Sequence, residues 1–187
     1  NRGDAYDEKK DFDRAIMDYD EALRLRPQVP VVLNNRGLAY SHKRDYDRAI
    51  QDYDEALRLQ PEYPDALINR GIAYYNKQKL DRAAADFERS IALRRQNPKA
   101  LFNLGILNYI RGNYAESVRN TMAGASFSGL NPQRALYLFA AQLRAGMDTS
   151  ELQAYLAKRM DFNVWPGQAF GLFAGRMSPE ALRSLDT

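Results

Sequence analysis

Residues 35–40 read NRGLAY, and this stretch returns along the chain at a fixed interval of 34 residues. Residues 1–6 read NRGDAY, residues 69–74 read NRGIAY, and residues 103–105 read NLG in the same register. A period of this length is typical of a helix pair that cannot bury its apolar face alone. The sequence therefore predicts an all-α protein in which neighbouring helix pairs stack and share one core.

The second repeat shows how one unit is built. A first helix is predicted over residues 30–43 and a second over 46–60, with Asp45 as N-cap of the second helix and Pro61 ending it. Gly37 marks where the two helices approach closely, because a side chain there would hold the backbones apart. The same reasoning predicts later helices at 114–126, 132–144, 150–159, 168–174 and 178–185.

The first half of the chain is densely charged, and its charges follow the repeat. Asp20 and Arg24 lie four residues apart with the acid first, as do Asp54 and Arg58. Pairs in this order stabilise a helix by about 0.2–0.5 kcal/mol each, so we expect both ion pairs to form within their helices.

Composition excludes several classes of function. The 187 residues carry a net charge of only +3 and contain no cysteine and a single histidine, His42. No nucleophile with a matching base, no metal cluster and no phosphate-binding loop is recognisable, so neither an enzyme nor a cofactor is predicted. A nucleic-acid site is not expected either, because Arg14, Arg48 and Arg82 each follow an aspartate. No apolar run is long enough to span a membrane, and the compartment stays open.

The repeat resembles the tetratricopeptide repeat (TPR) family. The family's pattern of bulky residue, glycine, tyrosine, alanine, aromatic residue, alanine and proline is matched in the second unit by Leu33, Gly37, Tyr40, Ala49, Tyr53, Ala56 and Pro61. The resemblance implies a right-handed superhelical solenoid of antiparallel helix pairs. About four units would occupy residues 1–130, the first truncated at its N-terminus. Residues 131–187 would supply a fifth first-helix and atypical C-terminal capping helices.

The chain departs from this pattern at one position, and its tail resembles a particular group within the family. Arg2, Arg36 and Arg70 stand where the family commonly has leucine, and Leu104 restores it. The tail resembles the ending of bacterial TPR lipoproteins of the NlpI type, which are envelope adaptors and often dimers. The residues that carry this second resemblance are Phe162, Trp165, Pro166, Phe170, Leu172, Phe173, Gly175, Ser178, Pro179, Glu180 and Leu182.

The resemblance also implies where a partner would bind, because first helices line the concave side of a TPR superhelix. Asn35, Asn69 and Asn103 form a ladder there, and such asparagines commonly pair with the main chain of a bound peptide. The apolar side chains expected around the ladder are Leu38, Ile68, Ile72, Tyr75, Phe102, Ile106, Tyr109 and Ile110. Two alternatives stay open: the asparagines bond only within the solenoid or to water, or the tail helices cover this face.

The function predicted is a non-catalytic adaptor or scaffold that binds a protein or peptide with apolar side chains. A clamp for a C-terminal carboxylate is not expected, because one of its basic positions holds Asn34, Ile68 and Phe102, and Lys99 is the only cation at the others. The acidic residues Asp4, Asp7 and Glu8 instead favour a basic stretch of ligand. Self-assembly as a homodimer and a role as accessory domain of a larger protein are the competing hypotheses.

Overall fold

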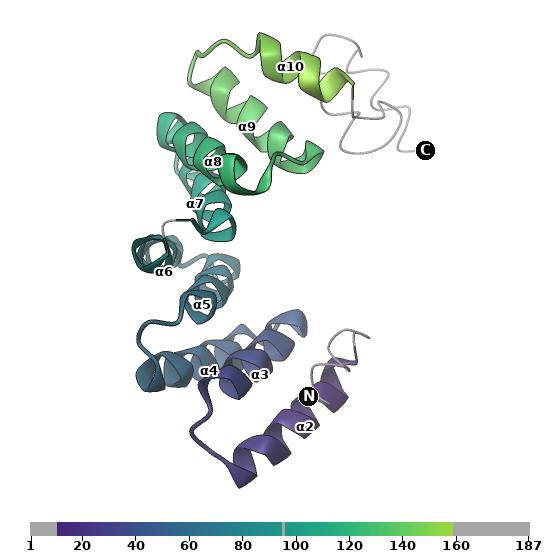
Figure 1. Ribbon diagram of the computed structural model, residues 1–187, viewed down its shortest axis with the longest axis vertical. Helices are drawn as coiled ribbons and strands as arrows, with labels where there is room; N and C mark the ends of the chain where they lie inside the picture. Colours follow the sequence, from purple (N-terminus) through teal and green to yellow (C-terminus); the bar gives the residue numbers. More distant parts are fainter. Residues whose placement is uncertain (1–10, 95, 159–187) are drawn as a thin grey trace. The chain divides into compact units, whose positions relative to one another are not determined.

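The computed structural model describes residues 11–94 and 96–158, and this part of the chain is built from α-helices without a β-strand. Helices follow one another in antiparallel pairs joined by short turns (Figure 1). The predicted all-α class is therefore confirmed. The described helices are α2 (Phe12–Leu25), α3 (Pro30–His42), α4 (Tyr46–Leu59), α5 (Pro64–Asn76), α6 (Leu80–Leu93), α7 (Pro98–Ile110), α8 (Tyr114–Ser128), α9 (Pro132–Arg144) and α10 (Ser150–Ala157).

Local signals set the ends of these helices. Asp45 caps α4 by accepting a hydrogen bond from the backbone N–H of Arg48 at 3.2 Å, and Asn131 caps α9 through Arg134 at 2.8 Å. A proline opens α3, α5 and α9, where its missing N–H costs nothing. Predicted and observed ends agree within two residues for these elements. The helices predicted at 168–174 and 178–185 lie outside the described residues.

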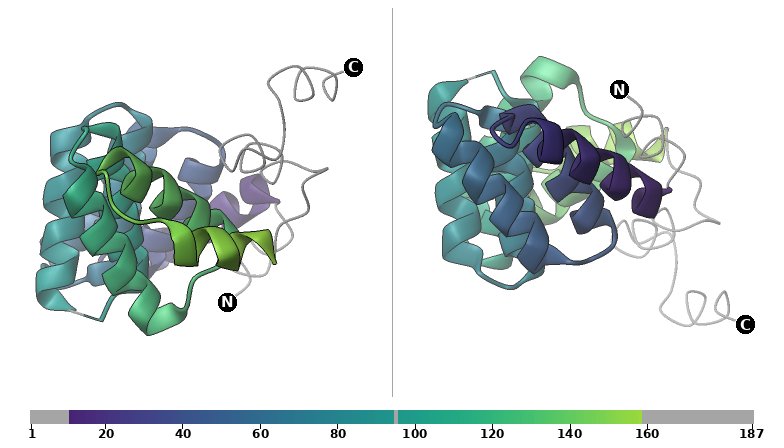
Figure 2. Two further views of the ribbon diagram at one scale, coloured as in Figure 1. Left: turned by 90° about the horizontal axis from the view of Figure 1, so that it is seen from above. Right: turned by 90° about the horizontal axis from the view of Figure 1, so that it is seen from below.

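The chain divides into two compact units, residues 1–104 and 105–187. In unit 1, α3 packs on α4 and α5 packs on α6, while the first helices α3 and α5 also touch each other (Figure 2). The repeat boundary predicted at residue 130 stays a prediction. The core of the first two described hairpins comes mainly from small and aromatic side chains at the repeat positions: Ala15, Tyr19, Leu33, Ala39, Tyr40, Ala49, Tyr53, Ala56, Ala66 and Leu67.

Glycine is required where the two helices of a pair meet. A Cβ added to Gly37 would lie 2.7 Å from a ring carbon of Tyr53, and one added to Gly71 would lie 2.6 Å from a ring carbon of Phe87. Carbon atoms in contact normally lie about 3.5–4.0 Å apart, so neither position has space for a side chain. Gly37 therefore stands where the two helices of its pair approach closely, as the sequence predicts, and Gly71 does the same in the next repeat.

The ion pairs of unit 1 differ from those predicted. Arg36 on α3 donates to Asp52 on α4 at 2.5 and 2.8 Å, and to Asp20 on α2 at 2.7 Å. Arg24 pairs instead with Glu21, three residues before it, so the predicted Asp20–Arg24 pair is wrong. The physical reason is competition: a half-buried guanidinium sixteen residues away binds Asp20 and leaves Arg24 to the nearer acid.

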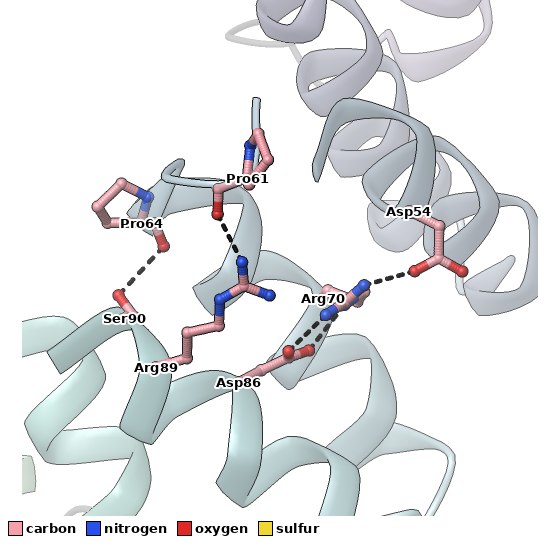
Figure 3. Close-up of polar contacts among 7 residues, drawn as sticks. All are labelled: Asp54, Pro61, Pro64, Arg70, Asp86, Arg89 and Ser90. Carbon is pink, nitrogen blue, oxygen red and sulfur yellow. Dashed lines mark hydrogen bonds and ion pairs between the residues drawn. The ribbon is translucent and has the colours of Figure 1, made fainter. Parts of the chain in front are cut away.

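The same network returns one repeat later. Arg70 donates to Asp86 at 2.6 and 2.8 Å and to Asp54 at 2.6 Å (Figure 3). Arg58 pairs with Glu55. The predicted Asp54–Arg58 pair is wrong for the same reason. Burial disfavours the Arg70 cation, but the hydrogen bonds that it donates to Asp86 and Asp54, together with their negative charges, outweigh this effect and raise the pKa of Arg70. Arg36 and Arg70, which stand at the position of the family's leucine, thus each tie three helices together.

Unit 2 has its own core. Val118 on α8 packs with Phe139 on α9 and Leu156 on α10. The hydroxyl of Tyr155 donates to the carbonyl oxygen of Leu130, which fixes α10 against the turn before α9. Gly105 faces Thr121 as Gly71 faces Phe87, since a Cβ there would lie 2.5 Å from the threonine hydroxyl oxygen. The two helices of this pair therefore also meet at a glycine, but the side chain that faces it is threonine instead of phenylalanine.

Candidate functional site

The predicted ladder lies on the first helices of unit 1. Asn35 on α3 and Asn103 on α7 are half-buried, whereas Asn69 on α5 is only 7% exposed. Asn103 makes no side-chain hydrogen bond to any residue that the structure describes. The three amides therefore stand on successive first helices, but their surroundings differ.

A fourth amide, Asn34, links the first two members of the ladder. The Asn69 Nδ2 group donates to Asn34 Oδ1 at 3.0 Å, and Asn34 Nδ2 donates to Asn35 Oδ1 at 3.2 Å. At the other end, Lys99 Nζ donates to Asn69 Oδ1 at 3.4 Å. We call this run of Lys99, Asn69, Asn34 and Asn35 the amide relay. It crosses α3, α5 and α7, and sequence reasoning missed it because it treated Asn34 as an empty clamp position.

The apolar residues expected beside the ladder fall into two groups. Leu38 on α3 and Ile72 and Tyr75 on α5 are half-buried, and they follow the ladder asparagines at helical spacing. Ile68 is 1% exposed, so its expected place on the binding surface is wrong. Ile68 is one of the fully buried core side chains. Phe102 is also buried, at 5% exposed.

The remaining predicted residues belong to unit 2. Ile106 and Tyr109 are half-buried, and the ring of Tyr109 meets that of Tyr114 edge-on at 5.5 Å. Tyr109 also packs against the core of this unit. We therefore describe these two residues apart from the ladder of unit 1.

His42 has a packing role. Its ring stacks on that of Phe12 at a centroid distance of 4.7 Å with an interplanar angle of 9°. This ring contact joins the end of α3 to the start of α2. No group of three metal-ligating side chains occurs among residues 11–94 and 96–158.

An open, polar cavity of about 370 Å³ lies at the α3–α4 turn, between residues 43–47 and Lys77. Both of its lysines are held in ion pairs, because Lys43 pairs with Asp13 and Lys77 pairs with Asp47. These pairs join the turn of one repeat to the second helix of the preceding one. The cavity is thus a consequence of turn packing, and no catalytic constellation lines it. No described helix has the length and apolar character needed to cross a membrane.

Stacked antiparallel helix pairs with a polar ladder on their first helices define a helical repeat protein of the solenoid class. The profile of the tetratricopeptide repeat family matches residues 1–65, 34–98 and 68–121. The chain belongs to the TPR family, as its sequence pattern predicts. A comparison with curated proteins gives no match.

Solved structures agree with this fold. A crystal structure of MamA superimposes with a TM-score of 0.73 and 20% identity, over 95% of this chain and 98% of that chain. YrrB, described as a TPR protein with an unusual peptide-binding site, gives 0.70 and 18% over 94% and 89%. The first TPR domain of Spaghetti (RPAP3), bound to the HSP90 peptide SRMEEVD, gives 0.57 and 30% over 59% and 87%.

Proposed function

We propose that unit 1 is a non-catalytic adaptor module that binds an extended peptide across its first helices. The observation that carries this proposal is the amide relay, which places side-chain amides in hydrogen-bonded order on α3 and α5. Side-chain amides hold both donors and acceptors, so they suit the main chain of a peptide whatever its sequence. Asn103 continues the ladder on α7.

Apolar side chains beside the amides indicate which side chains the bound peptide carries. Leu38 lies three residues after Asn35, and Ile72 lies three residues after Asn69, so each shares a helix face with its amide. Half-buried aliphatic groups that flank a polar ladder suit a ligand with bulky apolar side chains at intervals along an extended chain. The RPAP3 domain bound to the HSP90 peptide supports peptide binding by a TPR module.

The ligand carried by the RPAP3 domain ends in acidic residues, but this chain is poorly equipped for a carboxylate clamp. Asn34, Ile68 and Phe102 are between 1% and 5% exposed, so these positions offer neither charge nor access. Among the clamp positions that the structure describes, only Lys99 carries a cation. The basic stretch of ligand inferred from Asp4, Asp7 and Glu8 stays a prediction, because those residues lie outside the described part.

Selection of peptides provides the direct test. Phage-displayed random peptides are panned against the full chain, and enriched peptides are measured by isothermal titration calorimetry. Ile72→Glu should weaken binding by roughly tenfold or more, since it places a charge where an apolar group is expected. Leu25→Glu is the matched control, because Leu25 lies on α2 and is 66% exposed. Equal losses in both variants, or no enriched peptide, would refute the proposal.

Self-association is the second candidate function, and exposed apolar side chains in unit 2 favour it. Met122 and Phe127 on α8 are 53% and 48% exposed, and Leu143 on α9 is 49% exposed. Such side chains gathered in one small unit are a usual feature of protein contact surfaces. Light scattering over a concentration series separates the candidates, because a chain that stays monomeric throughout excludes a homodimer.

A further inference from the structure

Asn34 breaks the repeat pattern at a buried position. The equivalent residues of the next two units, 34 and 68 positions later, are Ile68 and Phe102, and all three side chains are at most 5% exposed. A buried amide is costly unless its polar atoms are hydrogen-bonded. Asn34 meets this condition with both Oδ1 and Nδ2, through Asn69 and Asn35. Its presence in place of an apolar side chain is therefore tied to the ladder.

The direction of the relay follows from its cationic end. A lysine ammonium group donates hydrogen bonds and accepts none, so Asn69 must turn its oxygen toward Lys99 and its NH₂ group toward Asn34. Asn34 must then meet that NH₂ group with its oxygen and point its own NH₂ group at Asn35. One exposed cation on α7 thereby fixes the orientation of three amides on two other helices.

We propose that Asn34 is a positioning residue for peptide binding and that Lys99 sets the direction in which it acts. Asn34 is too buried to touch a ligand, so it acts through Asn35, the half-buried ladder amide whose oxygen accepts its hydrogen bond. The occupant is the main chain of an extended peptide, which needs the ladder amides to present donor and acceptor in a fixed order. This inference rests on the peptide-binding function proposed above.

The relay is tested first without a ligand, by side-chain ¹⁵N–¹H spectroscopy on the full chain. In Asn34→Ile, which installs the side chain of the following repeat, the NH₂ signal of Asn69 should shift and exchange with solvent roughly fivefold to tenfold faster. Lys99→Met removes the cation at an exposed site and should move the signals of both Asn69 and Asn34. Lys79→Met is the matched control, because Lys79 is exposed at the start of α6 and outside the relay. Unchanged Asn34 and Asn69 signals in Lys99→Met would overturn the relay.

Binding is tested second, with a peptide enriched by the panning described above. Its affinity should fall roughly tenfold in Asn34→Ile and should be unaffected in Lys79→Met. A peptide that binds wild type and Asn34→Ile equally, while the amide signals differ, would overturn the positioning role and leave the proposed function standing. A chain that binds no enriched peptide would overturn both. Lys99→Met keeps the test decisive if Asn34→Ile fails to fold, because Lys99 lies at the surface.

Discussion

Replacement of Gly71 by alanine tests the close helix contact of the third repeat. The added Cβ would lie 2.6, 2.9 and 3.1 Å from three ring carbons of Phe87, which is about 1 Å inside normal contact distance. Relieving such overpacking costs about 1–3 kcal/mol, whereas alanine in place of glycine favours a helix by about 1 kcal/mol. The net loss in the free energy of unfolding should therefore be about 0–2 kcal/mol.

A double-mutant cycle isolates the steric term from helix propensity. Phe87→Val removes every ring atom that the new Cβ meets, at a cost of about 2–4 kcal/mol by itself. In that background Gly71→Ala should stabilise the protein by about 1 kcal/mol, because only the propensity gain is left. Urea unfolding followed by circular dichroism gives the four free energies. A coupling energy near zero, or a more stable Gly71→Ala single variant, would refute the argument that contact with Phe87 requires glycine.

Further predictions concern the ion pairs and the helix caps. Arg70→Leu should cost about 3 kcal/mol because it leaves the Asp86 carboxylate buried and unpaired, and adding Asp86→Asn should recover part of this loss in the same unfolding experiment. Asn97→Ala should cost about 1–2 kcal/mol, since Asn97 caps α7 by accepting from Ala100 at 3.2 Å; a melting temperature equal to wild type would contradict this. Hydrogen bonds from the side chain and backbone of Arg48 lower the pKa of Asp45 below 3.8, so the cap of α4 should be complete above that pH and be lost as pH falls through the lower folded value. An NMR titration of Asp45 with a midpoint at or above 3.8 would contradict the cap.

Much of the fold could be predicted because its signals are local and repeated. Prolines in the first turn of α3 and α9 and Asp45 before α4 set helix ends that the sequence predicts within two residues. The glycine at position 37 and the tyrosine at position 53 meet as their spacing implies. A period that repeats four times supplies the same information several times over, which is why the helix pairs were predictable from one chain.

The site was less predictable because its contacts join different repeats. Reasoning within one helix paired Asp20 with Arg24, whereas the structure pairs Asp20 with Arg36. The same limitation hid the bond between Asn34 and Asn69, which are 35 residues apart. A signal was present in the sequence: asparagine at a position where the next repeats have isoleucine and phenylalanine is an exception that calls for a polar partner. The binding role of the ladder itself stays a prediction.

The spacing of the half-buried arginines Arg36 and Arg70 determines which duplications of the chain keep their ion pairs. Arg36 and Arg70 each bind acids sixteen residues before and sixteen residues after themselves. After an in-frame tandem duplication of residues 36–69, the copied Arg36 would have an aspartate sixteen residues before it and another sixteen residues after it. Arg70 would keep an aspartate at both of these distances. A segment copied from the fourth unit would instead bring Leu104 and Asn120, and would strand carboxylates on the helices beside it. Lengthening by gene duplication is therefore tolerated in the charged half of the chain, but exchange of segments between the two halves is not.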